Sequence, residues 1–388
     1  MLDLFYDDTH RALRDSAAAW VDRHIAPHAA AWEEAGWFPE DLHRAAGDAG
    51  LLGVTCPEAL GGAGGDVFHG LIVAEALIGG GSVGVAMGLG SHAIALPPIL
   101  ALGSAEQQAR FVPPVLSGDK VAALAITEPA AGSDVAGIRT RAVRDGDSYV
   151  INGAKTFITS GLRADLVTVA VRTGGDPDDP KRRHEGISLV VVEKGTPGFH
   201  TGRALAKMGW WASDTAELFF EDCRVPADNL LGGEGMGFVG IMANFVGERL
   251  LLAASAVATA RLALDDTLAF VGQRRAFGRP LHGFQVTRHR LAEMAGREAA
   301  ARAFVSTVAE RARRGEDVAA DVAMAKNIAA EACAYVCDAA VQLHGGMGYM
   351  RECRVERLFR DQRLYAIGGG TTEIMNEVIW RRGLEPIV

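Results

Sequence analysis

The spacing of apolar residues changes twice along this chain of 388 residues. In the first part, apolar residues recur every three or four positions between Gly and Pro breaks, which predicts amphipathic helices. These predicted helices span residues 9–31, 38–49, 67–78, 93–102 and 105–116. Short β-rich runs follow, and long helical segments return from residue 237. The pattern therefore predicts three domains, at residues 1–120, 121–232 and 233–388.

The middle domain is predicted to be a β domain with a barrel-like or sandwich-like sheet. Asp-Gly, Asn-Gly and Pro-Gly pairs separate its short runs, which is typical of turns between strands. The β-rich runs lie at residues 140–143, 149–151, 166–171, 187–192 and 216–220. The segment 149–160 contains Asn152 followed by Gly153, and it predicts a hairpin that carries Phe157 and Thr159 on the same side.

The last domain is predicted to be a four-helix bundle, because four segments with helical periodicity follow one another. These segments lie at residues 238–270, 285–313, 318–343 and 372–381. The sequence shows no internal repeat. The order of helical domain, β domain and four-helix bundle gives an α+β fold class.

The charge balance and the cysteines exclude two classes of site. The net charge is −9, so a nucleic-acid-binding surface is not expected. Five cysteines form no disulfide framework, and the odd count favours a reducing compartment. Cys333 and Cys337 lie one helical turn apart near His344, but no second ligand pair follows at zinc spacing. We therefore expect small buried thiols there and no metal.

The amino terminus and the apolar runs bear on location. The first residues, MLDLFYDDTHRALRDS, are acidic and amphipathic, unlike a signal or transit peptide. The longest apolar run, residues 250–260, is too short to span a bilayer. We therefore expect a cytoplasmic protein without membrane insertion.

Two glycine-rich loops between residues 342 and 375 carry candidate chemistry. Helix C-caps would explain one or two glycines in each loop, but this stretch has six. Since Gly lacks a Cβ, the backbone of such loops can approach a flat ligand closely. Gln342, Thr371 and Glu373 add hydrogen-bonding side chains, so the two loops are interpreted as a cradle for a large polar cofactor.

Two further segments suit the same ligand. Residues 126–134 predict a loop that leaves a strand, and the hydroxyls of Thr127 and Ser133 suit phosphate or ring-edge contacts. Residues 274–285 form an arginine-rich turn that suits a pyrophosphate. Taken alone, that turn would be interpreted as a solvated basic loop.

Six motifs in this order resemble the acyl-CoA dehydrogenase family, and they are closest to its long-chain and isovaleryl-CoA branches. The motifs are ITEPAAGSD (126–134), NGAKTFITSG (152–161), KMGWWASDTAELFFEDCRVP (207–226), RRAFGRPLHGFQ (274–285), QLHGGMGY (342–349) and GGGTTEI (368–374). The resemblance implies FAD as cofactor, an acyl-CoA substrate, an electron-transfer flavoprotein as electron acceptor and a homotetramer. In that tetramer the Arg274 loop would meet the flavin bound to a neighbouring subunit.

The resemblance also implies ligand contacts, residue by residue. The implied flavin contacts are Leu124, Ile126, Thr127, Ser133, Phe157, Ile158, Thr159, Arg274, Phe277, Gln285, Gln342, Leu343, Gly345, Gly346, Thr371, Thr372 and Glu373. The implied substrate contacts are Ser133, Phe245, Arg249, Gly369 and Gly370. Phe157 departs from the tryptophan usual at this place, so an aromatic ring is kept while an indole donor is lost.

The general base of the reaction is not where most of the family carries it. The usual Tyr-Glu-Gly-Thr segment aligns with residues 368–371, and Gly369 stands in place of the glutamate. Glu248 offers an alternative, because it lies in an otherwise apolar helical stretch that would raise its pKa. An ion pair with Arg249 is disfavoured, since adjacent residues do not face each other on a helix. The isovaleryl-CoA and long-chain branches keep their base in this helix within a Glu-Arg-Leu segment, so the resemblance implies Glu248 as the catalytic base.

The expected function is FAD-dependent oxidation of an acyl-CoA to the trans-2,3-enoyl thioester, with the Gly369 N–H polarising the thioester oxygen. Gly368 and Gly369 remove side-chain volume near the reacting carbons, which favours long or branched acyl chains. Two alternatives remain. One is a flavoprotein of this fold that uses oxygen, such as an acyl-CoA oxidase or monooxygenase. The other is a non-catalytic binder of acyl-CoA or acyl-carrier protein, motivated by Gly369.

Overall fold

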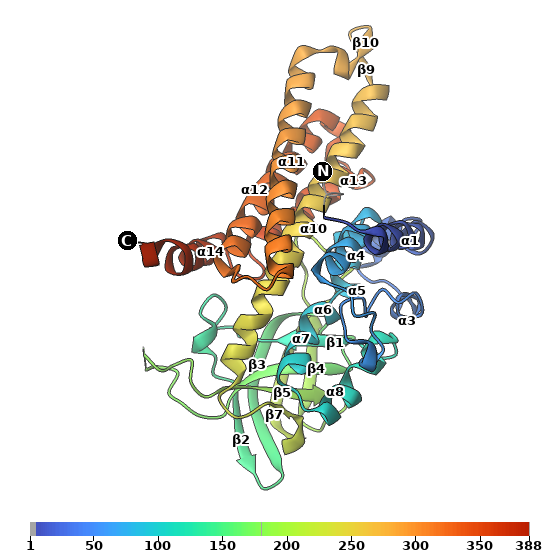
Figure 1. Ribbon diagram of the computed structural model, residues 1–388. Coiled ribbons are helices and arrows are strands. Elements are labelled where there is room, and N and C mark those ends of the chain that lie inside the picture. Colours follow the sequence, from blue (N-terminus) through green and yellow to red (C-terminus); the bar gives the residue numbers. More distant parts are fainter. Residues whose placement is uncertain (1–4, 180, 388) are drawn as a thin grey trace.

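The protein has three successive regions, an amino-terminal group of helices, a sheet and a group of long helices (Figure 1). The computed structural model describes residues 5–179 and 181–387. Helices extend to Leu116, strands occupy 122–231, and helices resume at Gly237. The predicted α+β fold class is confirmed, whereas the domain boundaries drawn from the sequence stay a prediction.

The amino-terminal helices are short, and several begin at clear caps. They are α1 (Asp8–His24), α2 (Ala29–Ala35), α3 (Asp41–Asp48), α4 (Val67–Gly79), α5 (Val83–Leu89), α6 (His92–Ala95), α7 (Pro97–Leu102), α8 (Ala105–Phe111) and α9 (Pro113–Leu116). The single helix predicted for residues 9–31 is interrupted after His24, because Pro27 cannot donate a helical hydrogen bond. Helix α5 was not predicted from its glycine-rich sequence; Ser82 caps it by accepting from the Val85 N–H at 2.9 Å.

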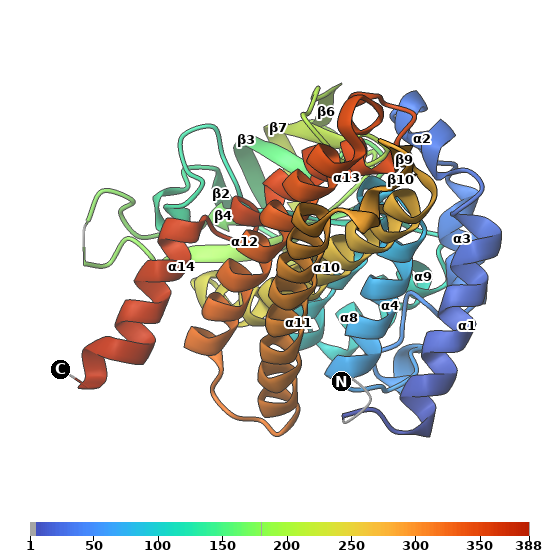
Figure 2. The ribbon, with the colours of Figure 1, turned by 90° about the horizontal axis from the view of Figure 1, so that it is seen from above.

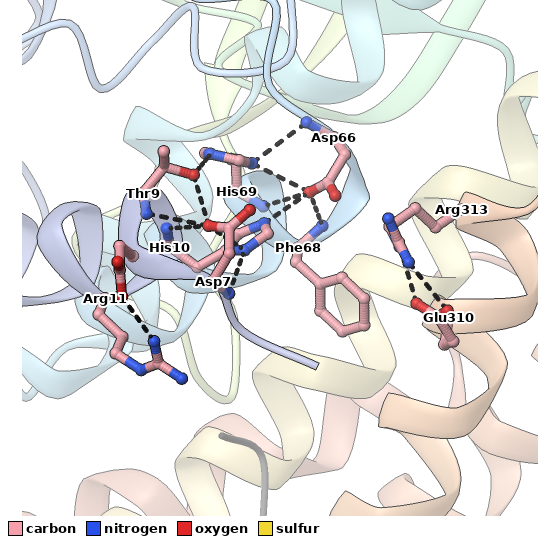
Figure 3. A network of polar contacts seen from close by, with 10 residues as sticks. Asp7, Thr9, His10, Arg11, Asp66, Phe68, His69, Glu310 and Arg313 are labelled. Carbon is pink, nitrogen blue, oxygen red and sulfur yellow. Dashed lines mark hydrogen bonds and ion pairs between the residues drawn. The ribbon is translucent and has the colours of Figure 1, made fainter. Parts of the chain in front are cut away.

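Helices α1 and α4 begin side by side, each with an Asp cap and a His three residues later (Figure 3). The Asp7 and Asp66 carboxylates accept first-turn N–H groups, and Nδ1 of His10 and of His69 accepts the N–H of the capping Asp at 3.2 Å. His10 Nε2 lies 2.9 Å from Asp66 Oδ1, which ties the two helix starts together. His10, Asp66 and His69 are close enough to hold a metal ion, but both Nδ1 atoms already serve the caps, and helix N-termini disfavour a cation.

The central region is one sheet in the order β6-β7-β3-β2-β4-β5-β8, with β1 parallel to β4. The strands are β1 (Ala122–Ala125), β2 (Arg141–Asp145), β3 (Ser148–Thr159), β4 (Leu166–Arg172), β5 (Ile187–Glu193), β6 (Phe199–Ala204), β7 (Thr215–Pro226) and β8 (Leu230–Leu231). Strand β4 is buried along its whole length, and β5 everywhere but its last residue, as expected for two strands that are mostly apolar in sequence.

The predicted hairpin at Asn152-Gly153 is wrong. Both residues lie inside β3, and the turn of the hairpin between β2 and β3 falls at residues 146–147. The Asn152 side chain exchanges two hydrogen bonds with Asp222 of β7, at 2.9 and 3.1 Å, where the pairing register shifts. A Cβ on Gly153 would lie 2.6 Å from the Thr140 hydroxyl, so glycine serves a bulge here and not a turn.

The carboxy-terminal region is built on three long helices that pack side by side, α10, α11 and α12, with α14 against α12 (Figure 2). Its elements are α10 (Gly237–Gln273), β9 (Arg275–Ala276), β10 (Arg279–Pro280), α11 (Gln285–Arg313), α12 (Ala319–His344), α13 (Arg354–Asp361) and α14 (Thr372–Ile379). Helix α10 runs from beside the sheet to the β9–β10 tip at the far end of the molecule (Figure 1).

Helix α10 is long and apolar enough to cross a membrane by length and composition, which the run of residues 250–260 had not indicated. More than half of its most apolar stretch is buried, against α4, α11 and α12. Burial of this kind is typical of a core helix, and one such helix is weak evidence for a span. Cys333 and Cys337 are buried in α12 as predicted, whereas the His344 ring stacks on Phe270.

Candidate functional site

A cavity of about 1290 Å³ lies between the sheet, the amino-terminal helices and α10. Apolar side chains dominate its wall, with a smaller number of polar groups among them, as is usual for ligand sites. The wall joins segments from every region: α4 to α6, the loop after β1, the end of β3, the first half of α10, and residues 368–371.

Many of the residues singled out from the sequence line this cavity. They are Leu124, Ile126, Thr127, Ser133, Phe157, Ile158, Thr159, Phe245, Glu248, Arg249, Gly369, Gly370 and Thr371. Nine others are not in its wall: Arg274, Phe277, Gln285, Gln342, Leu343, Gly345, Gly346, Thr372 and Glu373. The structure of one chain therefore brings together only part of the predicted set.

The loop after β1 is held by a buried carboxylate. Glu128 accepts the N–H groups of Arg139 at 2.7 Å and Thr140 at 2.9 Å, and it pairs with the buried Lys155 ammonium at 2.8 Å. Burial acts to raise the pKa of Glu128, but Lys155 and the N–H donors outweigh it, so the pKa is lowered. This ionised anchor fixes the loop that carries Thr127 and Ser133 to the cavity wall.

Phe157 presents an aromatic face to the cavity. Its backbone has φ 59°, which is unusual for a bulky residue, and the β3–β7 pairing is irregular between Lys155 and Ile158. The ring is 68% exposed, although an aromatic side chain in a sheet is usually packed. Backbone strain combined with an open ring is typical of a site that receives a ligand. The hydroxyls of Thr127, Ser133 and Thr159 line the same cavity, so the donor set fits a flat, polar, aromatic cofactor.

Glu248 lies in the first half of α10 and lines the cavity. Burial raises its pKa from 4.5 to about 7, and the charges of Arg249 and Lys326 oppose that rise. A carboxyl group with a pKa near neutrality can be ionised before proton transfer and can hold the proton afterwards. Glu248 therefore has the properties of a general base.

The glycine turn at residues 368–370 lies next to this carboxyl group. Gly369 and Gly370 have φ 65° and 103°, a region that favours glycine. Arg249 Nε donates to the Gly369 carbonyl at 2.9 Å, and Lys326 Nζ donates to the Gly370 carbonyl at 2.7 Å. A Cβ on Gly369 would lie 3.5 Å from Glu248 Oε1. The helical carboxylate therefore reaches the space that a side chain at residue 369 would enter.

Lys326 was not identified from the sequence. The signal that could have indicated it is its place as the single lysine in the alanine-rich α12. Sequence reasoning also missed Asp361 and Lys207, which line the cavity. The Trp210 N–H donates to Asp361 Oδ1 at 2.6 Å. Burial, reinforced by Glu33, raises the pKa of Asp361 to about 7, and burial lowers the pKa of Lys207 to about 8.

The cavity also has an apolar part. Its wall comes from the segment after α3 and from helices α4 and α5, and includes Leu51, Leu52, Val54, Val67, Leu71, Val73, Ala74, Leu77, Ala86, Met87 and Leu89. A Cβ added to Gly247, which also lines the cavity, would meet no atom within 4 Å, so the cavity is open there as well. An apolar tail can thus be accommodated in this part of the cavity.

The family descriptions that match the chain cover most of its length. "Acyl-CoA dehydrogenase, N-terminal domain" matches residues 7–119, the middle domain matches residues 123–223, and the C-terminal domain matches residues 235–384. "Long-chain specific acyl-CoA dehydrogenase, mitochondrial" of Sus scrofa is 42% identical over 381 residues, 97% of this chain and 86% of that protein. "Isovaleryl-CoA dehydrogenase, mitochondrial" of Oryza sativa subsp. japonica is 38% identical over 97% of this chain and 92% of that protein.

Solved structures agree with these matches. A structure described as a probable acyl CoA dehydrogenase from Mycobacterium abscessus superposes with a TM-score of 0.94 at 53% identity, over 97% of this chain and 99% of that chain. A glutaryl-CoA dehydrogenase from Mycobacterium smegmatis, solved in complex with FADH2, superposes with a TM-score of 0.91 at 26% identity, over 99% of this chain and 96% of that chain.

Proposed function

This chain belongs to the acyl-CoA dehydrogenase family, and from that premise we propose that it oxidises long or branched acyl-CoA thioesters with Glu248 as the general base. Members of the family are FAD-dependent oxidoreductases that act on CH–CH donors. The observation that carries the proposal is the position of Glu248, whose Oε1 lies 3.5 Å from the Cβ position of Gly369.

Glu248 removes the α-proton of the thioester. The α-carbon–hydrogen bond breaks, and the proton is held on the Glu248 carboxyl group, whose pKa of about 7 suits both states. The backbone N–H of Gly369 polarises the thioester oxygen. Arg249 supports this N–H by binding the Gly369 carbonyl, so the turn keeps its orientation during proton transfer.

The cavity residues Thr127, Ser133, Phe157 and Thr159 fit FAD, because an open aromatic face and several hydroxyls line the cavity. Thr127, Ser133, Phe157, Thr159 and Thr371 would hold it. When bound, FAD supplies the acceptor for the hydride that leaves the β-carbon.

A homotetramer accounts for the flavin residues that lie outside the cavity. At 1.5 Å per residue, about 40 Å of α10 separates Glu248 from Arg274, so one flavin ring beside Glu248 cannot also touch Arg274 of the same chain. The Gln342 loop lies at the same far end, since the His344 ring stacks on Phe270 with centroids 4.2 Å apart. The exposed Phe277 there supports burial against another copy.

The apolar part of the cavity wall supports a long or branched acyl chain. Apolar side chains of α4 and α5 line part of the cavity, and the open space beside Gly247 would accept a branch of the acyl chain. The relatives named for long-chain and isovaleryl-CoA substrates support both choices.

The electron acceptor is proposed to be an electron-transfer flavoprotein, and the free cysteines support a reducing, cytoplasmic location.

Anaerobic titration of the purified yellow protein tests this function. Palmitoyl- and isovaleryl-CoA should bleach the flavin absorbance, butyryl-CoA should do so less efficiently, and an electron-transfer flavoprotein should restore the colour. Rapid reoxidation by air with peroxide release would indicate an oxidase instead. Absence of bleaching by every acyl-CoA, with the acyl thioester still bound, would indicate a binding protein.

A further inference from the structure

Lys326 is a buried cation whose role the proposed reaction does not yet explain. It lies on α12 among alanines and is 1% exposed. Burying an ammonium group costs several kcal/mol unless nearby groups compensate. The hydrogen bond that its Nζ donates, at 2.7 Å, goes to the carbonyl of Gly370, which is a neutral acceptor. Compensation therefore requires a nearby negative charge.

The nearby negative charge is Glu248. A Cβ on Gly369 would lie 3.6 Å from Cε of Lys326 and 3.5 Å from Oε1 of Glu248, so both side chains reach the same point from different helices. Arg249 completes the arrangement by donating to the Gly369 carbonyl. Two cations thus bind the carbonyls of two consecutive glycines, and the carboxyl group lies beside them.

The electrostatic causes agree with this geometry. For Glu248, burial raises the pKa while Arg249 and Lys326 lower it. For Lys326, burial lowers the pKa to about 8, Arg249 lowers it further, and Glu248 raises it. The charged groups that act on both therefore lie on α10 and α12, while Arg363 and Arg381 line the same cavity from the segments on either side of α14.

We propose that Lys326 is a positioning residue for the dehydrogenation: its ammonium group holds the Gly369–Gly370 turn against α12 and favours the ionised form of the Glu248 carboxyl group. This inference rests on the proposed function, because it requires Glu248 to be the base. A cation that only filled space would need neither the carbonyl contact nor the approach to the carboxyl group.

Three substitutions separate the charge from the hydrogen bond. Lys326→Met removes both, Lys326→Gln keeps a donor for Gly370 without the charge, and Lys326→Arg keeps both. The measurement is kcat/KM from about pH 5 to 9. With Lys326→Met and Lys326→Gln, the acidic limb should move to higher pH by about one unit, because the carboxylate loses an opposite charge. With Lys326→Arg, the limb should stay near its original position.

A second readout does not depend on turnover. The difference in unfolding free energy between the parent and Glu248→Gln, measured across pH, reports the pKa of Glu248 in the folded state. Because that pKa is raised, the carboxyl group contributes most below pH 4.5, and its contribution is lost as the pH rises to about 7. In the Lys326→Met or Lys326→Gln background, this loss should extend to higher pH.

Arg302→Met is the control, since Arg302 is a cation that pairs with Glu75 and Glu298 outside the cavity wall. It should lower stability without moving the acidic limb. An unmoved limb in both Lys326→Met and Lys326→Gln would overturn the inference, while continued activity would leave the proposed function intact. Full activity of Glu248→Gln would instead overturn the proposed function itself. If Lys326→Met fails to fold, the comparison of Lys326→Gln with Lys326→Arg decides.

Discussion

Glu248 Oε1 lies 3.5 Å from the position that a Cβ on Gly369 would occupy. A carboxylate on α10 and a carboxylate on the glycine turn would therefore reach the same part of the cavity. This relationship explains how the chain can lack a glutamate at residue 369 and still present a base to an acyl thioester. It also leaves the turn free for two backbone carbonyls to bind Arg249 and Lys326.

Returning a carboxylate to residue 369 should rescue a variant that lacks the helical base. In Glu248→Gln, adding Gly369→Glu should restore activity only in part, because residue 369 has φ 65° and the new Cβ would lie 2.7 Å from Leu252 Cδ1. Adding Leu252→Ala should relieve that contact and raise kcat at least about tenfold. Gly369→Gln in the same background is the control, and rescue by Gln would show that the carboxylate is not responsible.

Filling the open space at Gly247 should narrow the substrate range. Gly247→Leu should lower kcat/KM for isovaleryl- and palmitoyl-CoA by about tenfold or more relative to butyryl-CoA, because a side chain would enter the open cavity. Gly296→Leu on α11 is matched, since its Cβ also meets no atom within 4 Å but lies outside the cavity wall. An equal loss for all three substrates would contradict the assigned pocket.

Removing Arg274 should weaken both cofactor retention and assembly. Arg274→Ala is expected to lower flavin content after purification and to shift gel filtration towards smaller species, because a cofactor bound across an interface stabilises that interface. Arg182→Ala, in an exposed surface loop, should change neither property. Parent-like flavin content and elution of Arg274→Ala would contradict the cross-subunit contact.

The paired caps at the starts of α1 and α4 should govern stability at low pH. Burial acts to raise the pKa of Asp66, but hydrogen bonds with His10 and His69 outweigh it, so the pKa is lowered below 3.8. Its contribution is therefore present above pH 3.8 and lost as the pH falls through the lower folded value. Asp66→Ala should cost about 1 kcal/mol in urea unfolding at neutral pH, and Asp66→Asn less. The same loss at every pH would contradict this account.

The helical pattern predicted the fold well where glycines bound a long periodic stretch. The predicted segment 285–313 coincides with α11, because a long amphipathic stretch lies between Gly283 and Gly315. The pattern failed where glycine has two uses. Gly153 was interpreted as part of a turn but lies at a bulge. The glycine-rich helix α5 was missed, since the cap at its start is the local feature that marks it as a helix.

Only those site residues could be predicted whose own type and place in the sequence indicate a chemical role. Glu248 stands out as a charge in an apolar helix, and motifs indicated Phe157 and Thr127. Lys326 was missed because its role depends on a turn 44 residues later in the chain, a relationship that only the tertiary structure shows. Arg274 lies far from the cavity of its own chain, since the length of α10 separates Arg274 from Glu248.

The most direct test of the central claim is the rate of anaerobic flavin reduction in Glu248→Gln. The glutamine keeps the shape of the side chain but cannot accept a proton, so palmitoyl-CoA should still bind while the rate falls by about 10³-fold. Flavin content, circular dichroism and palmitoyl-CoA affinity should match the parent, which separates lost chemistry from lost folding. A rate within about threefold of the parent would show that Glu248 is not the base, since general-base catalysis contributes far more than that.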